Sequence, residues 1–274
     1  MKIESKLIHC GDRKKPGNFV PVTTPIYTAA SYFYESMGQL DRVMGREEEG
    51  PSYARYDNPT NNALEELVNE LEGGGGTVAC ASGMSAVHLA LLAALLDRPK
   101  RVVAASVLYG ATTSMLMKIL EPLGIETAFV DICDLNAVER AVAGTKTGAV
   151  LMETVSNPLL RVGEMDKIAV IARSAGAPLI VDNTFATPLL VRPLELGASM
   201  VVHSATKYMA GHGDVLGGIL VADQDNCGLI RTLSRTMGPV MSPFESYLTM
   251  RGIKTLGLRM ERSIRSATAA TVGL

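Results

Sequence analysis

The chain has 274 residues, of which 47% are hydrophobic and 20% are charged, and it contains no tryptophan. This composition is typical of a globular protein with one large core or two modest ones. The formal net charge of −2 argues against a nucleic-acid-binding surface. The four cysteines, at positions 10, 80, 133 and 227, lie far apart without a CxxC spacing, which argues against a zinc site and against a secreted disulfide scaffold. We therefore expect a protein of the reducing cytoplasm, and the N-terminal MKIESKLIHC contains no apolar signal region.

Residues 1–55 carry little apolar periodicity and are interrupted by proline and glycine. This pattern predicts an extended arm. A helix is predicted directly after the arm, with Asn58 as its cap, Pro59 in its first turn and Gly73 at its end. Its apolar stripe consists of Leu64, Leu67, Val68 and Leu71. We interpret the helix as the start of an α/β domain over residues 56–240.

Residues 77–96, TVACASGMSAVHLALLAALL, form a nearly uncharged segment whose length alone would fit a membrane span. The segment begins with the β-prone run TVACA, is interrupted at Ser82 and Gly83, and becomes helical only afterwards. The favoured interpretation is therefore a buried strand, a tight turn and a core helix, with a membrane helix as the alternative.

Short apolar runs predict further buried strands along the chain. They are RVVAA (101–105), ETAFV (126–130), GAVLM (148–152), PLIV (178–181), SMVV (199–202) and GGILV (217–221). Most of them alternate with helix-like segments that end in glycine, such as TTSMLMKILEPLG, DLNAVERAVAG and DKIAVIARSAG. The alternation predicts an α/β fold with a mostly parallel central sheet flanked by helices.

Polar residues follow five of the predicted strands directly. They are Ser82 to Met84, Tyr109, Glu153 with Asn157, Asp182, and Ser204 to Lys207. Open parallel sheets bind ligands at the carboxyl ends of their strands. These residues are therefore predicted to converge on one crevice.

Each of these signals also has a simpler interpretation. Ser82 to Met84 can be an ordinary turn, Tyr109 a half-buried aromatic residue, and Asp182 a cap. His203, His212 and Asp214 could form a metal site, but histidines nine positions apart without a further cluster are more often hydrogen-bonded structural residues. A nucleotide-binding α/β protein is a further alternative, which the absence of GxGxxG and P-loop patterns disfavours. The common position at strand ends favours a functional site.

A lysine, an aspartate and a glycine-rich anion cradle together point to one cofactor. A lysine amine can hold an aldehyde cofactor as a Schiff base, and an acidic partner can keep the pyridine nitrogen of that cofactor protonated. Pyridoxal 5'-phosphate is the cofactor that needs both groups.

Seven segments in order resemble a known family. They are SYARYDNPT (52–60), SGMSA (82–86), LYGAT (108–112), ETVSNP (153–158), VDNTFATP (181–188), HSATKYMAGHGD (203–214) and RGIKTLGLRM (251–260). They are similar to the Cys/Met-metabolism enzymes of the fold-type I pyridoxal-phosphate group, which includes cystathionine γ-synthases and γ-lyases, methionine γ-lyases and O-acylhomoserine sulfhydrylases. The resemblance covers nearly the whole chain. It implies a fold-type I transferase-like structure in which residues 241–274 begin a C-terminal domain that is mostly lacking.

The resemblance also implies how the cofactor is held. Lys207 is the attachment lysine, Asp182 pairs with the ring nitrogen, Asn157 reaches the phenolic oxygen and Tyr109 stacks on the ring. The phosphate is held by the hydroxyls of Ser204 and Thr206 and by the backbone N–H groups of Gly83 and Met84 at a helix start. Glu153 receives no definite role.

Tyr53 and Arg55, by the same resemblance, reach the phosphate of a neighbouring subunit's active site, and a guanidinium suits that anion. This implies a homo-oligomer, a dimer or a tetramer, in which the arm of residues 1–55 contributes to the neighbour. Neither residue has an obvious structural role in its own subunit by sequence alone. No partner nucleic acid, membrane or metal is expected.

The implied activity is γ-replacement, or γ- or β-elimination, on homoserine-derived or sulfur-containing amino acids. Lys207 would remove the substrate Cα proton, and Tyr109 would donate a proton to the leaving group or take one from an incoming amine. Ala111 and Ser114 depart from the residues typical of methionine γ-lyases and of cystathionine enzymes, so the substrate stays open. No arginine can be assigned to the substrate carboxylate. A cofactor-binding protein with weak catalysis is therefore the second hypothesis.

Overall fold

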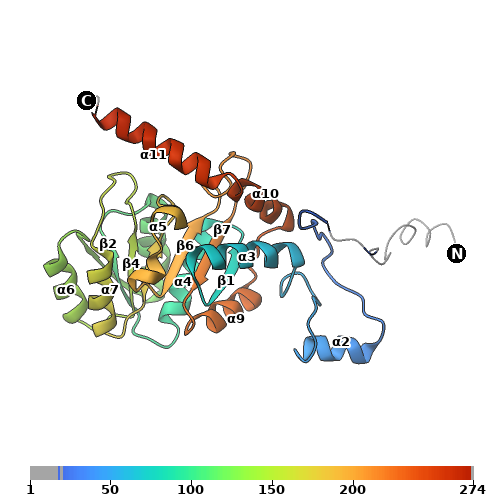
Figure 1. The fold of residues 1–274 in the computed structure, drawn as a ribbon. Helices are drawn as coiled ribbons and strands as arrows, with labels where there is room; N and C mark the ends of the chain where they lie inside the picture. Colours follow the sequence, from blue (N-terminus) through green and yellow to red (C-terminus); the bar gives the residue numbers. More distant parts are fainter. Residues whose placement is uncertain (1–17, 19–20, 273–274) are drawn as a thin grey trace.

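The computed structural model describes residue 18 and residues 21–272, and its centre is a seven-stranded sheet (Figure 1). The strands are β1 (Gly76–Cys80), β2 (Arg101–Ala105), β3 (Glu126–Val130), β4 (Ala149–Glu153), β5 (Leu179–Asp182), β6 (Met200–Ser204) and β7 (Gly218–Ala222). Their order across the sheet is β1-β7-β6-β5-β4-β2-β3. Only β7 pairs antiparallel with its neighbours, β1 and β6. The predicted mostly parallel sheet is confirmed, and each predicted strand lies within two residues of its expected bounds.

Ten helices surround the sheet in the described residues. They are α2 (Met37–Met44), α3 (Pro59–Glu72), α4 (Gly83–Leu95), α5 (Gly110–Met115), α6 (Leu135–Ala143), α7 (Met165–Ser174), α8 (Thr187–Leu190), α9 (Cys227–Met237), α10 (Pro243–Ile253) and α11 (Leu256–Val272). A π-helical turn, η1 (Leu116–Leu120), and a 3-10 turn, η2 (Glu121–Leu123), continue α5, and a second 3-10 turn, η3 (Pro193–Leu196), precedes β6.

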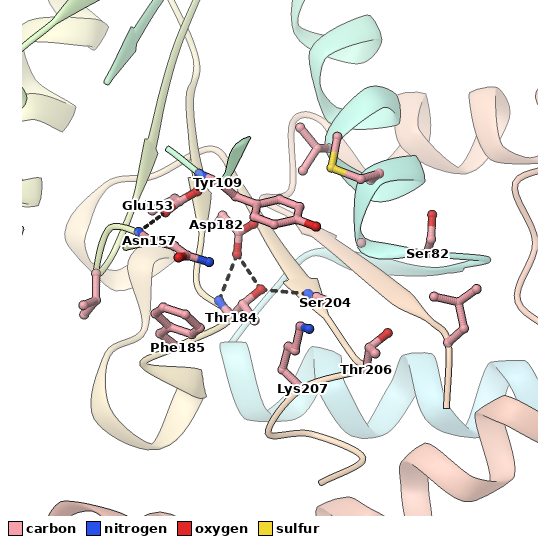
Figure 2. A pocket seen from close by; sticks show the side chains of 15 residues that line it. Ser82, Tyr109, Glu153, Asn157, Asp182, Thr184, Phe185, Ser204, Thr206 and Lys207 are labelled. Carbon is pink, nitrogen blue, oxygen red and sulfur yellow. Dashed lines mark hydrogen bonds between the residues drawn. The ribbon is translucent and has the colours of Figure 1, made fainter. Parts of the chain in front are cut away.

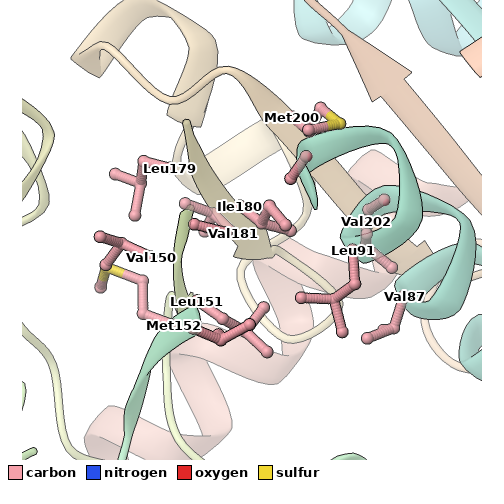
Figure 3. Close-up of a cluster of buried hydrophobic side chains, with 14 of the residues drawn as sticks. Val87, Leu91, Val150, Leu151, Met152, Leu179, Ile180, Val181, Met200 and Val202 are labelled. Atoms are coloured by element: carbon pink, nitrogen blue, oxygen red, sulfur yellow. The ribbon is translucent and has the colours of Figure 1, made fainter. Parts of the chain in front are cut away.

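The sheet is covered on both faces, and the alternation of its side chains shows how. On β1 and β6, Val78 and Val202 pack in the cluster that contains α4, whereas Ala79 and Val201 pack in the cluster that contains Leu64 of α3. Figure 3 shows Val87 and Leu91 of α4 beside Val202. Both faces of these strands are therefore buried, which is why their sequences are continuous apolar runs.

Helix α4 is apolar on nearly every side because it lies between the sheet and other helices. It contacts β6 and β7 and also packs against α9 and α5. Residues 77–96 thus form strand β1, a turn and the core helix α4, as predicted. In the part of the chain that the structure describes, no helix combines the length and the apolar character needed to cross a bilayer.

Helix α3 begins and ends as the sequence predicts. The Asn58 side chain accepts hydrogen bonds from Thr60 N and Asn61 N, and Gly73 is left-handed with φ 70°. Within the predicted stripe, Leu64 and Val68 are fully buried, whereas Leu67 and Leu71 are half-buried. Two glutamates of the helix, Glu65 and Glu72, are also buried, which the pattern did not predict.

The arm predicted for residues 1–55 contains a helix that the sequence analysis missed. Within its described part, Ser36 caps α2 by accepting from Gln39 N at 3.2 Å. The chain around Ser31 forms an isolated bridge with Tyr53. Figure 1 shows α2 at the end of a long excursion away from the sheet. Residues 1–17 and 19–20 of the predicted arm lie outside the described residues.

The last two described helices follow the α/β domain. Leu256 and Met260 of α11 are buried, but residues 261–271 are all exposed. Figure 1 shows α11 projecting beyond the body of the molecule. That residues 241–274 begin a C-terminal domain stays a prediction.

Candidate active site

A cavity of about 230 Å³ lies at the carboxyl ends of the strands. Five strands deliver polar residues to it, either at their last positions or in the turns that follow, as expected for a sheet of this topology. The predicted site residues that line it are Gly83, Met84, Tyr109, Asn157, Asp182, Ser204, Thr206 and Lys207 (Figure 2). Glu153 and Ser82 line it as well. The structure therefore brings together every predicted site residue except Tyr53 and Arg55.

Asp182, at the end of β5, places a carboxyl group in the cavity, and its two oxygens differ in their hydrogen bonds. Its Oδ1 accepts from Thr184 N at 3.0 Å and from Thr184 Oγ1 at 2.5 Å. Its Oδ2 takes no hydrogen bond from the described part of the chain. Burial raises the pKa of Asp182 above its usual range, while the Thr184 hydrogen bonds and the nearby His203 act in the opposite direction. A cation placed beside Oδ2 would stabilise the ionised carboxylate.

The start of α4 and the end of β6 form an anion cradle. The Ser82 hydroxyl caps Ser85 N at 3.1 Å, and the first-turn N–H groups of Gly83 and Met84 have no acceptor within the helix. A Cβ on Gly83 would lie 2.9 Å from Ser204 Cβ, so only glycine allows the two turns to approach this closely. Helix N-termini with free N–H groups bind phosphate and other anions.

The hydroxyl of Thr206 is already engaged within the chain. It accepts from Gly217 N at 3.1 Å and donates to Gly217 O at 3.3 Å. A hydroxyl group has only one proton to donate. To donate to a phosphate, the Thr206 hydroxyl would therefore have to give up its hydrogen bond to Gly217 O. No hydrogen bond of the Ser204 hydroxyl occurs within the described residues, and its backbone N–H donates to Thr184 Oγ1 at 2.8 Å.

Lys207 and Tyr109 bring an amine and a phenol to the same cavity. Figure 2 shows the Lys207 amine directed toward the space beside Ser204 and Asp182, with the Tyr109 ring above it. Within the described chain, no carboxylate lies within 4.0 Å of the Lys207 amine. Tyr109 is 49% exposed, so its ring can stack on a ligand.

Tyr53 and Arg55 lie away from this cavity and have partners within their own chain. The Arg55 guanidinium lies 4.5 Å from the centroid of the Tyr56 ring and 5.5 Å from that of Tyr53. Its Nη1 donates to Arg235 O. Arg55 therefore has contacts within its own subunit that the sequence did not indicate.

Sequence reasoning missed five residues that line the cavity, which are Val87, Val155, Thr184, Phe185 and Leu216. Thr184 links two strand ends because its hydroxyl donates to Asp182 and accepts from Ser204 N. The spacing Asp-x-Thr was the available signal, since short polar side chains commonly bond to groups two residues away.

A buried polar network lies behind Asp182. His203 Nε2 and Glu72 Oε1 are 2.6 Å apart, and Asn183 Nδ2 donates to the same oxygen at 3.0 Å. His212 Nδ1 bonds instead to Ala210 O at 2.7 Å. Among the described residues, no group of three or more histidine, cysteine, aspartate or glutamate side chains could hold a metal ion. The metal-site alternative for His203, His212 and Asp214 has no support from this arrangement.

Comparison with known proteins identifies the family. Residues 4–272 match the family described as Cys/Met metabolism PLP-dependent enzyme. The chain belongs to this family. It is 42% identical to a cystathionine gamma-lyase of Bacillus subtilis over 95% of this chain and 66% of that protein. It is 41% identical to an L-methionine gamma-lyase of Pseudomonas putida over 92% of this chain and 62% of that protein.

The fold agrees with solved structures of the same group. A cystathionine gamma-lyase from Lactobacillus plantarum, complexed with L-serine, superposes with a TM-score of 0.80 at 36% identity, over 94% of this chain and 65% of that one. The fold-type I prediction is confirmed. The chain thus spans about two thirds of the length of the relatives that it matches.

The residues at the cavity fit pyridoxal phosphate, the cofactor of the family. A lysine amine, a buried carboxyl with one free oxygen and an exposed aromatic ring suit the aldehyde and the pyridine ring. The close approach at Gly83 leaves an anion cradle that a side chain would fill.

Proposed function

We propose that this chain carries the cofactor site of a pyridoxal-phosphate enzyme that acts on homoserine-derived or sulfur-containing amino acids, by γ-replacement or by γ- or β-elimination. The convergence of Lys207, Asp182 and Tyr109 from three strand ends on one cavity carries the proposal. The names of its relatives, a cystathionine gamma-lyase and an L-methionine gamma-lyase, support this substrate class. The reducing cytoplasm, which the cysteine spacing predicts, is the proposed location.

In this proposal the chemical steps depend on Lys207, Asp182 and Tyr109. Pyridoxal phosphate, when bound, supplies an electron-withdrawing ring that stabilises negative charge at a substrate carbon. Lys207 would hold the cofactor through its amine, and the same amine would accept the proton from the substrate Cα. The Asp182 carboxylate keeps the ring nitrogen protonated, and Tyr109 gives a proton to the leaving group or takes one from an incoming amine.

The remaining residues are proposed to hold and orient the cofactor. Asn157 bonds to the phenolic oxygen of the cofactor. The N–H groups of Gly83 and Met84 and the hydroxyls of Ser204 and Thr206 bind its phosphate. Fixed donors of this kind hold the ring at one angle, so that the same bond of the substrate is always presented to Lys207.

Covalent attachment tests the proposal. The chain is incubated with pyridoxal phosphate, reduced with borohydride, and analysed by mass spectrometry for a labelled lysine. The label is expected on Lys207 and should disappear in Lys207→Ala but stay in the control Lys118→Ala, because Lys118 is an exposed lysine of η1. Equal labelling of Lys207→Ala at another lysine would refute the assignment.

Turnover is measured separately, with cystathionine, methionine and O-acylhomoserine as substrates and release of keto acid or thiol as the signal. Cofactor binding with no turnover of any of them would favour the second hypothesis, a cofactor-binding protein with weak catalysis.

We further propose that the protein is at least a dimer in which Tyr53 and Arg55 complete the phosphate site of the neighbour. The support is that neither residue lines the cavity of its own chain, while Tyr53 is 45% exposed. Loss of one charge-assisted contact in Arg55→Ala should weaken cofactor affinity roughly ten- to a hundredfold.

Mixing distinguishes a role in the neighbour from a role in the same subunit. At low cofactor concentration, Arg55→Ala subunits alone should label poorly at Lys207. When they are mixed with Lys207→Ala subunits, each hybrid has one site with an intact Lys207 and an Arg55 from the partner. Labelling of the Arg55→Ala subunits should therefore recover. No recovery in hybrids shown to form would mean that Arg55 does not act across the interface.

A further inference from the structure

Glu153, the last residue of β4, makes a bridge between two turns that line the cavity. Its Oε1 accepts from Tyr109 N at 2.6 Å, and its Oε2 accepts from Asn157 N at 2.8 Å. The first N–H belongs to the turn after β2 and the second to the turn after β4 itself. Each oxygen of one carboxylate thus holds one turn, as Figure 2 shows for the three residues at one end of the cavity.

The position of this carboxylate is fixed by the sheet. Glu153 pairs in register with Asp182 on the adjacent strand β5 and is only 7% exposed. A strand residue in the middle of a sheet moves little, whereas turns are free to move. The two N–H bonds therefore tie the movable residues to a rigid point.

The side chains of the two tied residues have few other restraints, whereas the backbone carbonyl of Tyr109 also accepts from Thr112 N at 2.9 Å and from Thr113 N at 3.2 Å. No hydrogen bond is made by the side chains of Tyr109 and Asn157 to the described part of the chain, and Tyr109 caps α5 without a side-chain bond. Both side chains are free to contact a ligand. Their placement depends on their backbone, and Glu153 holds the N–H group of each residue.

We propose that Glu153 is a positioning residue whose two oxygens fix Tyr109 and Asn157 relative to each other, and so set the place of the stacking ring and of the amide that bonds to the cofactor. The proposal rests on the function proposed above, since it assigns Glu153 a task within that same site.

The charge of Glu153 gives the bridge a dependence on pH. Burial raises the pKa of Glu153 to about 7, the Asp182 carboxylate adds to the rise, and the two N–H bonds act against it. The other titratable groups that line the cavity are Tyr109, after β2, Asp182, at the end of β5, and Lys207, after β6. An ionised carboxylate accepts at both oxygens, whereas a protonated one has an O–H that must donate. The bridge should therefore loosen as the pH falls below about 7.

The test compares Glu153→Gln with Glu139→Gln, the same change at an exposed residue of α6. A glutamine side chain accepts only at its oxygen, so one of the two N–H groups loses its partner. Amide hydrogen exchange of the cofactor-free chain, followed by mass spectrometry, should be about tenfold faster or more in segment 106–112 or 155–160 of Glu153→Gln. Cofactor affinity, measured by absorbance titration, should fall by a similar factor, and Glu139→Gln should match the unmutated chain in both.

The pH profile separates positioning from a purely structural role. In the unmutated chain, protection of the two segments, corrected for intrinsic exchange, should drop as the pH falls through about 7. The step should persist in Glu153→Asp and be absent from Glu153→Gln. The step in the unmutated chain needs no variant, so a failure of Glu153→Gln to fold leaves the test intact.

Three results would overturn the inference. The first is unchanged exchange in both segments of Glu153→Gln, and the second is the absence of the step in the unmutated chain. The third is faster exchange with unchanged cofactor affinity, which would leave Glu153 as a structural acceptor only. If even the unmutated chain fails to bind pyridoxal phosphate, the proposed function fails, and the exchange data alone decide whether Glu153 holds the two turns.

Discussion

Gly83→Ala should damage the site by moving one of the two turns that we propose to bind the cofactor phosphate. The added Cβ would lie 2.9 Å from Ser204 Cβ and 3.1 Å from both Ser204 Cα and Oγ. Because Ser204 ends a central strand, the start of α4 must yield. Overpacking of this kind costs about 1–3 kcal/mol of folding free energy. Displacing the Gly83 and Met84 N–H groups from a phosphate should cost a further ~1.5–3 kcal/mol of binding, or roughly ten- to a hundredfold in affinity.

Denaturant unfolding and cofactor titration measure the two effects separately. Gly110→Ala is the matched control, since a Cβ at Gly110, the first residue of α5, meets no atom within 4 Å. It should change stability by about 0.5 kcal/mol or less. Adding Ser204→Gly to Gly83→Ala removes the Cβ and the hydroxyl that clash, so stability should recover while phosphate affinity stays weak. Identical unfolding of Gly83→Ala and Gly110→Ala would refute the argument from close approach.

Three further predictions follow from buried carboxyl groups. Asp182→Asn should retain the cofactor but slow exchange of the substrate Cα proton, measured in heavy water, by about a hundredfold or more, because a neutral amide cannot hold the ring nitrogen protonated; near-normal exchange would remove Asp182 from the chemistry. The pKa of Glu153 is raised to about 7 in the folded chain, against 4.5 when unfolded. The folded chain therefore holds this proton more tightly, and the unmutated chain should lose stability relative to Glu153→Gln as the pH rises from 5 to 8, by about 3 kcal/mol at most. Parallel curves of unfolding free energy against pH would contradict this. Arg231→Ala removes the guanidinium that lies 2.7 Å from the buried Glu65 carboxylate and should lower the free energy of unfolding by about 3 kcal/mol. Arg42→Ala, which breaks an exposed pair with Glu48, should lower it by under about 1 kcal/mol in the same assay.

Much of the fold was predictable because local signals agree with the tertiary structure. Strands such as Arg101–Ala105 are continuous apolar runs since both faces are covered, and helices such as α3 carry their own cap and stop residues. Helix α2 was missed because its cap, Ser36, is its main local signal and only Val43 within it is buried. The π-helical turn Leu116–Leu120 has no recognised sequence signature at all.

The buried charges were not predictable from local pattern. Glu65 and Glu72 occupy polar positions of an amphipathic helix, which normally face solvent. Glu72 is buried because His203, 131 residues later, lies opposite it, and Glu65 is buried against Arg231 and Ala79 N. Such pairs depend on which elements the fold brings together. The site residues at the strand ends were predictable because ligands bind at the carboxyl ends of parallel strands. Applying this rule requires only the bounds and directions of the strands, which the sequence indicates, and no distances between residues.

The single antiparallel strand explains how the anion cradle is built from distant parts of the chain. Because β7 runs opposite to β1 and β6, it begins at the edge where those two strands end. Its first residue, Gly218, pairs with Cys80 on one side and Ser204 on the other. A Cβ on Gly218 would lie 2.1 Å from Ser82 O, so only glycine lets the turn after β1 cross over β7. The turn then reaches Ser204, where Gly83 permits close contact. Both glycines are needed because β1 and β6, whose ends form the proposed anion cradle, are separated by β7.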